Sequence, residues 1–277
     1  MKILVTGAKG QLGFDIVKEL TARNILHKGV DVEDFDITDK SAVFTAIETY
    51  QPTVVIHCAA YTAVDKAEDE PELCHKINVN GTRNIAEACK QINAKMIYIS
   101  TDYVFAGEGN HFHKITDPTS PKSIYGKTKR DGECAVIETL SQHFIVRISW
   151  VFGKNGNNFV KTMLRLGKER DTINVVSDQI GSPTYTADLA PLLCDMTASE
   201  RYGIYHATNE GTCSWAEFAQ EIFKQAKLDT QVNPILSSEY PTKAIRPLNS
   251  RLDKHCLDDT SFNRLQHWQD GLKHFLK

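Results

Sequence analysis

Hydrophobic residues in the first half of the chain form short unbroken runs, separated by stretches in which apolar residues recur every three or four positions. The runs predict buried strands at residues 2–5, 53–56, 96–99 and 144–148, with a weaker one inside 25–32. The periodic stretches predict helices after residue 12, over 41–51, from about residue 71 and from Tyr125. Strands alternating with helices predict an α/β fold with a doubly wound parallel sheet, which is Rossmann-like.

The pattern loosens beyond residue 153. It predicts helices at 160–166, 188–196 and from Trp215 after a Ser214 cap, and a strand at 203–207. Residues 179–185 are polar and rich in turn formers, and the segment around Arg246 and Ser250 is expected to be an irregular tail. We therefore expect one domain at 1–153 and a smaller mixed region at 154–277, some of whose segments return to the first domain.

Three glycines separate the first strand from the first helix. Gly7, Gly10 and Gly13 are spaced G-x-x-G-x-x-G rather than G-x-G-x-x-G. Glycine permits a tight turn and lets a pyrophosphate approach the backbone at the helix N-terminus. A glycine turn without a ligand is the alternative, but the strand–helix context favours a dinucleotide-binding domain.

Acidic residues after the second strand bear on the choice of cofactor. Asp31 lies eighteen residues past Gly13, near the distance expected for a carboxylate on the adenosine ribose 2′-OH. Lys9 and Lys28 could instead meet a 2′-phosphate. The cofactor is therefore NADH or NADPH, with Asp31 favouring NADH. Asp36-Ile37 could cover the adenine, although each of these acids could equally be a solvated loop residue.

Several small or polar residues follow predicted strands, where open parallel sheets place their ligand crevice. Ala59-Ala60, Thr101 and Trp150 all fall at such ends. We expect them to converge on one crevice, covered by a C-terminal region that is mainly substrate-binding. Asn78 lies in a predicted helix, where asparagine is unfavourable, so its side chain has either a role or simple surface exposure.

Tyr125 and Lys129 are the candidate chemistry. They are four residues apart and share one face of a helix. A nearby ammonium is expected to lower the pKa of the phenol, which could then exchange a proton with an oxygen as hydride reaches its carbon. The Thr101 hydroxyl could hold the same oxygen. The chain has nine tyrosines, so a chance pair is the alternative, and the convergence of strand ends argues against it.

Composition excludes several classes of protein. The 277 residues are 41% hydrophobic and 24% charged, with a net charge of −3, so nothing favours nucleic acid binding. The first strand leaves no room for a signal peptide, and no apolar run is long enough to cross a membrane. The seven cysteines form no C-x-x-C pair, which favours reduced thiols in a cytoplasmic protein without a metal site.

Six segments resemble the extended short-chain dehydrogenase/reductase family, in the family's order and over most of the chain. They are Thr6–Gly13, Cys58–Asp65, Ser100–Phe105, Tyr125–Lys129, Arg147–Gly153 and Gly181–Thr184. The members most similar to this chain reduce 4-keto sugar nucleotides. The resemblance implies NAD(P)H-dependent reduction of dTDP-4-dehydro-6-deoxy-L-mannose to dTDP-L-rhamnose, with hydride going to C4.

The resemblance also assigns residues. It implies a catalytic set of Thr101, Tyr125 and Lys129. Expected cofactor contacts, from the glycine turn and the resemblance together, are Gly7, Gly10, Gln11, Leu12, Gly13, Asp31, Asp36, Ile37, Ala59, Ala60, Tyr61, Thr62, Asn78, Tyr125 and Lys129. Expected substrate contacts are Thr101, Asp102, Tyr103 and Trp150.

Two departures from the family pattern matter. Ala106 stands where the family often has aspartate, which puts some loop contacts in question. Some members bind Mg²⁺ at a dimer interface through glutamates, and Asp15 and Asp188 stand at the matching positions here. These shorter side chains argue against a metal-linked dimer, so Mg²⁺ is not assigned and the chain is a monomer or a homodimer.

Two other functions compete. A sugar-nucleotide dehydratase or epimerase has the same fold, but dehydratases of the family carry Thr-Asp-Glu where this chain has Thr101-Asp102-Tyr103. A non-catalytic regulatory subunit of methionine adenosyltransferase also resembles the family and binds a partner enzyme. The complete set of Thr101, Tyr125 and Lys129 argues against that role.

Overall fold

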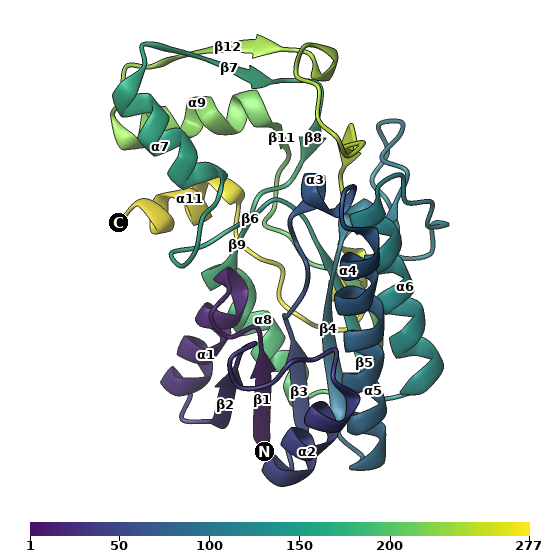
Figure 1. Ribbon diagram of the computed structural model, residues 1–277. Coiled ribbons are helices and arrows are strands. Elements are labelled where there is room, and N and C mark those ends of the chain that lie inside the picture. The colour runs from purple at the N-terminus through teal and green to yellow at the C-terminus, as the bar shows by residue number, and fades with distance from the viewer.

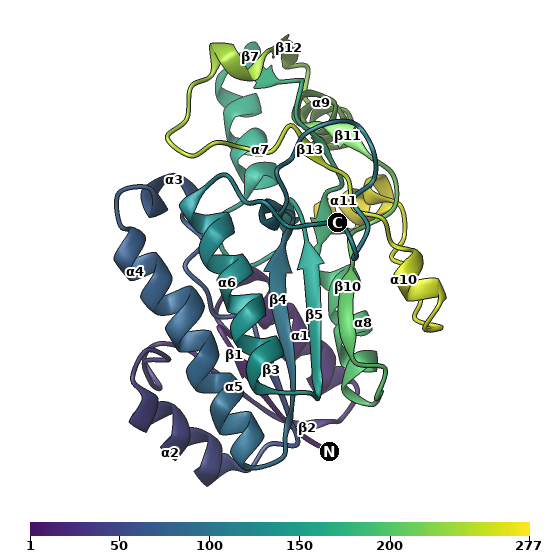
Figure 2. The ribbon, with the colours of Figure 1, turned by 90° about the vertical axis from the view of Figure 1, so that its right-hand side faces the viewer.

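The computed structural model describes residues 1–277 and is built on a six-stranded parallel sheet of order β10-β5-β4-β3-β1-β2 (Figures 1 and 2). Its strands are β1 (Lys2–Thr6), β2 (Leu26–Val30), β3 (Val54–His57), β4 (Lys95–Thr101), β5 (His143–Ile148) and β10 (Gly203–His206). The register aligns Ile3 with Val54 and Val54 with Lys95, so neighbouring strands end at the same edge. The predicted doubly wound α/β fold is confirmed.

Helices cover both faces of this sheet (Figure 2). One face carries α1 (Gln11–Ala22) and α8 (Thr186–Thr197), and the other carries α2 (Lys40–Tyr50), α5 (Thr82–Gln91) and α6 (Ile124–Thr139). Successive strand side chains point to opposite faces, so Ile3 packs toward α1 while Leu4 packs toward α2. This alternation explains why the strands are apolar at nearly every position.

Two elements of the large sheet layer come from the region beyond residue 153. Strand β10 pairs in parallel with β5, with Gly203 opposite Phe144, and helix α8 packs along α1. Figure 1 shows α8 near α1, and Figure 2 shows β10 beside β5. The sheet is therefore completed by residues beyond position 185.

A smaller lobe sits above the carboxyl edge of the sheet (Figure 1). It contains α7 (Phe159–Glu169), α9 (Trp215–Ala226), α11 (Trp268–Leu276), and a two-stranded sheet of β7 (Thr172–Val176) and β12 (Gln231–Ile235). Its separate core includes Phe152, Phe218 and Trp268. Ser214 caps α9 through a reciprocal bond pair with Glu217, as its position in the sequence predicts.

Several short elements complete the fold. They are β6 (Val151–Phe152), β8 (Ile180–Gly181), β9 (Thr184–Tyr185), β11 (Cys213–Ser214), β13 (Asn249–Ser250), α3 (Val64–Ala67), α4 (Pro71–His75) and α10 (His255–Asp258). A π-helical stretch at Lys76–Gly81 joins α4 to α5. No helix is long and apolar enough to cross a membrane.

The expectation of an irregular tail was wrong in part. Helix α11 buries Trp268, Leu272 and Phe275, whose spacing is helical but covers little more than two turns. Strands β7 and β12 pair only with each other, so neither shows a long apolar run. Residues 179–185 contribute β8 and β9 rather than turns alone.

Candidate active site

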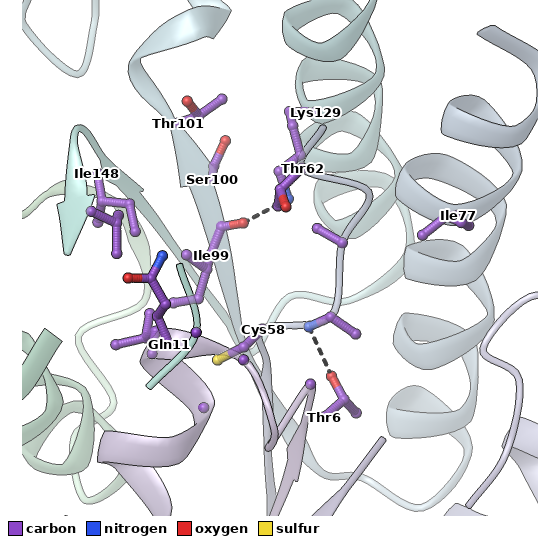
Figure 3. A pocket seen from close by; sticks show the side chains of 18 of the residues that line it. Thr6, Gln11, Cys58, Thr62, Ile77, Ile99, Ser100, Thr101, Lys129 and Ile148 are labelled. Atoms are coloured by element: carbon purple, nitrogen blue, oxygen red, sulfur yellow. Dashed lines mark hydrogen bonds between the residues drawn. The ribbon is translucent and has the colours of Figure 1, made fainter. Parts of the chain in front are cut away.

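A cavity of ≈ 750 Å³ lies at the carboxyl ends of the central strands (Figure 3). It brings together most of the residues singled out from the sequence: Gly7, Gly10, Gln11, Leu12, Gly13, Asp31, Asp36, Ile37, Ala59, Ala60, Thr62, Thr101, Asp102, Tyr103, Tyr125, Lys129 and Trp150. Tyr61 and Asn78 do not line it. Strand ends far apart in the sequence therefore meet at one crevice.

The glycine turn has no room for side chains. Gly7 has φ +66°, and a Cβ there would lie 2.7 Å from the Ala59 nitrogen. A Cβ on Gly13 would overlap the Gly7 carbonyl, because the first turn of α1 packs directly on the loop. Gly10 precedes α1 without a side-chain cap, so the amides of Gln11 and Leu12 in the first turn of α1 are available to an anion. These features fit a dinucleotide pyrophosphate.

Asp31 ties the end of β2 to the glycine turn. Its two carboxylate oxygens accept hydrogen bonds from the amides of Lys9 and Val32, each at 2.9 Å. The ammonium of Lys9 pairs with Glu33 at 3.0 Å, and Lys28 does not line the cavity. Negative charge therefore dominates at this end of the cavity.

Asp36 and Ile37 line the same end. The Asp36 carboxylate accepts bonds from the Thr38 amide at 2.8 Å and the Thr38 hydroxyl at 2.9 Å, and the backbone bond lowers the pKa of Asp36. Ile37 packs on Gly81, where a Cβ would come within 2.8 Å of its side chain. Asn84 holds the Ile37 carbonyl at 3.0 Å. The loop that closes this end is thus fixed by α5 and the π-helical stretch before it.

Asn78 supports the cavity from behind. Its side chain accepts from the Tyr61 amide at 2.8 Å, and donates to the Tyr61 carbonyl at 3.2 Å and to Thr128 Oγ1 at 3.1 Å. The Tyr61 hydroxyl donates to Glu70 at 2.7 Å, away from the cavity. Asn78 therefore anchors the 59–62 loop against α6, the helix that carries Tyr125.

Tyr125 lies in the first turn of α6, which Ser123 caps by accepting from the Gly126 amide at 3.1 Å. Its ring stands edge-on to that of Tyr103, with centroids 5.5 Å apart. Burial raises the pKa of Tyr125, while a hydrogen bond with the Thr101 side chain acts to lower it. The expected lowering by Lys129 is not found, because desolvation dominates. Tyr125 is a neutral phenol, the form that donates a proton.

Lys129 is 3% exposed and lies under the end of β4. Its ammonium donates to the Ile99 carbonyl at 2.7 Å (Figure 3). It also sits 4.0 Å from the centroid of the Tyr98 ring. Burial lowers the pKa of Lys129 to about 7, and the negative charge of Glu133 acts in the opposite direction. The lysine therefore titrates near neutrality.

Thr101 and Asp102 form the rim of the substrate side. The Thr101 hydroxyl donates to Asp102 Oδ1 at 3.1 Å and accepts from the Tyr103 amide at 3.2 Å. The Ser250 hydroxyl donates to the other Asp102 oxygen. Burial raises the pKa of Asp102 to about 6, and the bonds from Ser250 and Thr101 oppose that shift. The C-terminal region thus fixes a carboxylate at the end of β4.

Trp150 connects the cavity to the smaller lobe. It adopts φ +50° and stacks on Trp215 of α9, with ring centroids 3.7 Å apart and planes 12° apart. Its carbonyl accepts from the Thr184 amide at 3.1 Å. The indole is a rigid apolar wall between the sheet layer and the lobe.

A buried ionic network that no sequence pattern predicted lies beneath the site. Glu133 accepts two bonds from Arg147, at 2.7 and 2.9 Å, and a third from Ser100. Two signals were available: Glu133 follows Lys129 by one helical turn, and Arg147 interrupts an apolar strand. The network fixes β4, β5 and α6 relative to one another.

A loop after β6 was also missed. Asn158 donates to Gln11 Oε1 at 2.9 Å, Asn155 donates to the Lys9 carbonyl at 2.5 Å, and Gly156 lines the cavity. These bonds close the loop over the glycine turn. Polar residues after a strand gave only a weak signal of this contact.

Asp15 and Asp188 are bound within the chain. Asp15 accepts from Thr186, while Asp188 accepts from Asn209 at 2.7 Å and from Gln266 at 2.8 Å. Burial raises the pKa of Asp15. Neither carboxylate belongs to a cluster of metal-ligating side chains.

The parallel sheet, the glycine turn at α1, and Tyr125 and Lys129 at one cavity define a dinucleotide-binding protein of the short-chain dehydrogenase/reductase type. The model of the RmlD substrate binding domain family matches residues 1–277. The chain belongs to this family.

The relatives are similar to this chain over nearly their full length. The chain is 41% identical to the dTDP-4-dehydrorhamnose reductase of Aggregatibacter actinomycetemcomitans, over 98% of this chain and 97% of that protein. A crystal structure of a Clostridium acetobutylicum dTDP-4-dehydrorhamnose reductase is 44% identical with a TM-score of 0.97, covering 100% of this chain and 98% of that one. The Bacillus anthracis enzyme, solved in complex with NADP, is similar to the same degree (44%, TM-score 0.97, covering 99% and 98%).

Proposed function

We propose that this protein reduces the 4-keto group of dTDP-4-dehydro-6-deoxy-L-mannose to give dTDP-L-rhamnose, using a nicotinamide cofactor. The observation that carries the proposal is the meeting of Tyr125, Lys129 and Thr101 with the glycine turn at one cavity. Full-length relatives named dTDP-4-dehydrorhamnose reductase support this substrate.

The cofactor would be held along the glycine side of the cavity. The turn of Gly7, Gly10 and Gly13 would receive the pyrophosphate at the amides of Gln11 and Leu12, and Asp31 would accept from the adenosine ribose. Asp36, Ile37, Ala59, Ala60 and Thr62 would enclose the adenosine half and the linking groups. Tyr61 and Asn78 would act indirectly, by positioning that wall.

When bound, the reduced nicotinamide supplies hydride to C4 of the sugar. Tyr125 supplies the proton that the C4 oxygen then needs, and burial keeps its phenol protonated at neutral pH. Thr101, the last residue of β4, would hold the same oxygen by a hydrogen bond. Lys129 would orient the nicotinamide ribose and offset the charge left on Tyr125 after transfer.

The substrate would enter from the side of the smaller lobe. Thr101, Asp102, Tyr103 and Trp150 would contact the sugar, with Trp150 as the apolar wall. In this division, residues 1–153 would hold the dinucleotide and supply these four sugar contacts, and residues 154–277 would mainly form the rest of the substrate-binding region. Helix α8 and strand β10 are the segments that return to the first domain.

For the cofactor, we propose that NADH is preferred and NADPH tolerated. The Asp31 carboxylate faces the cavity, and Glu33 already neutralises Lys9, the only lysine of the glycine turn. A 2′-phosphate would therefore meet more negative than positive charge.

The site disfavours a dehydratase. Loss of water from C5–C6 needs a second carboxylate beside Thr101, where the Tyr103 ring stands edge-on to Tyr125. Asp102 is bound by Thr101 and Ser250. A reductase consumes one reduced nicotinamide per turnover, whereas a dehydratase or epimerase regenerates its NAD.

The test is an assay of purified protein with a panel of 4-keto sugar nucleotides, each with NADH and NADPH. We expect the nicotinamide absorbance to fall in proportion to the dTDP-4-keto-6-deoxy-L-sugar supplied, and the protein to carry little bound NAD. Arrival saturated with NAD, with a sugar nucleotide converted and no net absorbance change, would show that the reductase proposal is wrong.

A further inference from the structure

Three metal-ligating side chains that the proposed reaction does not use meet on the loop between β4 and α6. His111 Nε2 lies 3.6 Å from Asp117 Oδ2, and His113 Nδ1 lies 4.0 Å from the same oxygen. One ligand atom from each residue lies within 4.8 Å of the others. They border a second cavity of ≈ 560 Å³, which shares no lining residue with the dinucleotide cavity.

The three side chains are held in place by their surroundings. His113 is 5% exposed, and its ring stacks on Phe105 with centroids 4.4 Å apart and planes 4° apart. Its amide donates to the Arg251 carbonyl at 2.9 Å, and its own carbonyl accepts from the Asp253 amide at 2.8 Å. The site therefore rests on a buried imidazole whose backbone is paired with the C-terminal segment.

The other two ligands are anchored as well. The His111 carbonyl accepts from Asn249 Nδ2 at 2.8 Å, and Asp117 Oδ2 accepts from the Lys114 amide at 2.9 Å. Only the His111 ring is exposed, and it follows Gly109, whose φ is +73°. His111 can therefore move toward a ligand while His113 and Asp117 stay fixed.

One ring nitrogen of the cluster has no hydrogen-bond partner. It is the buried Nε2 of His113, the ring nitrogen that does not face Asp117. Nδ1 of His113, which lies 4.0 Å from Asp117 Oδ2, is the candidate ligand atom of that ring. Neutral imidazole is the form that ligates metals.

We propose that His111, His113 and Asp117 bind one divalent transition-metal ion of the Zn²⁺ type. Two imidazoles and a carboxylate suit Zn²⁺, Co²⁺ or Ni²⁺, whereas Mg²⁺ prefers ligands that are all oxygen. Tetrahedral ligands about 2.1 Å from zinc lie about 3.4 Å apart. The two His–Asp separations of 3.6 and 4.0 Å need only a small contraction, and the ligand atoms of the two imidazoles lie within 4.8 Å of each other.

Such an ion would rigidify the 106–117 loop, in which the backbone of His113 is already paired with Arg251 and Asp253 of the segment that carries Ser250. Ser250 donates to Asp102 at the rim of the active-site cavity, and Phe105 under His113 follows Asp102 by three residues. The site is separate from the reduction chemistry, so its existence does not depend on the proposed function.

The test is titration of the untagged protein with Zn²⁺ in competition with a chromophoric chelator, and with Co²⁺ followed by its visible spectrum. The Cys134→Ser background removes the exposed thiol. We expect about one ion per chain, no cobalt–thiolate absorption, and no effect of Mg²⁺. His111→Gln alters an exposed side chain, so the variant should still fold. It should weaken Zn²⁺ binding by at least ~10-fold, because loss of even a residue that only supports a ligand typically costs that much.

His75→Gln is the matched control, since His75 is an exposed histidine of α4 outside the cluster. Zn²⁺ should raise the thermal midpoint of the parent and of His75→Gln, but not that of His111→Gln or Asp117→Asn. Absence of saturable binding, or binding that survives both His111→Gln and Asp117→Asn, would overturn the proposal.

Discussion

The ammonium of Lys129 donates a hydrogen bond to the carbonyl of Ile99 across 2.7 Å. This bond fixes the lysine to the strand that carries Thr101, two residues further on, rather than to the Tyr125 phenol. Lys129 thereby couples α6 to β4 near Tyr125 and Thr101, the proposed catalytic residues that these two elements carry. Its burial, which brings its pKa to about 7, makes the charge of this group responsive to ordinary changes of pH.

Replacing Tyr125 by phenylalanine should remove the proton donor while preserving the ring. General acid catalysis typically contributes about 10²–10⁴-fold, so kcat should fall by that order with the cofactor Kd nearly unchanged. Tyr61→Phe is the control, since that hydroxyl bonds Glu70 outside the cavity. Steady-state rates that survive in the Tyr125→Phe protein would rule out the assigned role.

Lys129→Met should weaken cofactor binding as well as slow the reaction. In the free protein the pKa of Lys129 is about 7, so the ammonium is lost as pH rises through that value. If contact with the cofactor ribose favours the ammonium, binding takes up a proton above pH 7, and affinity must fall as pH rises further. Fluorescence titration of NADH should show this slope in the parent and a weak, flat profile in the variant. An unchanged Kd would restrict Lys129 to an electrostatic role.

Removing the Asp31 carboxylate should change cofactor preference. Asp31→Ala should shift the ratio of kcat/KM values toward NADPH, since a 2′-phosphate would no longer face a negative charge. Asp31→Asn is the matched variant, because an amide oxygen can still accept from the Lys9 or Val32 amide. A shift toward NADH in either protein would mean that Asp31 is not at the ribose.

Asn78→Ala should act on stability and on cofactor binding together. It leaves the partly buried amide and carbonyl of Tyr61 without their partner, and an unsatisfied group costs about 1–3 kcal/mol when it is fully buried. We expect a lower urea midpoint and a raised KM for the cofactor. Asn80→Ala, at an exposed position of the same stretch, should change neither. A normal KM in a destabilised Asn78→Ala protein would show that the 59–62 loop is positioned without it.

The features that could be predicted from the sequence are those determined by residues close together in the chain. The glycine turn sits between an apolar run and an amphipathic helix, and Tyr125 and Lys129 share a helical face, so both were found. The prediction that Lys129 lowers the pKa of Tyr125 was wrong, because the sequence does not show how deeply the phenol is buried.

Contacts between residues far apart in the chain could not be predicted from local sequence patterns. Ser250 lies 148 residues from Asp102, and Asn158 lies 147 from Gln11, yet each pair forms a hydrogen bond at the cavity. Asn78 attracted notice as an unfavourable helix residue, but its partners Tyr61 and Thr128 come from two other elements. Such pairings are set by tertiary packing, which no local pattern encodes.

Strand β10 has a consequence for synthesis of the chain. Until residues 203–206 have been made, β5 has an unpaired edge that includes Phe144 and Val146, and α1 lacks the cover of α8. A nascent chain ending near residue 153 would expose an apolar strand edge open to pairing with another copy. The six-stranded sheet and its covering helices can therefore become stable only after these later residues have left the ribosome. Completion of the glycine turn is not enough.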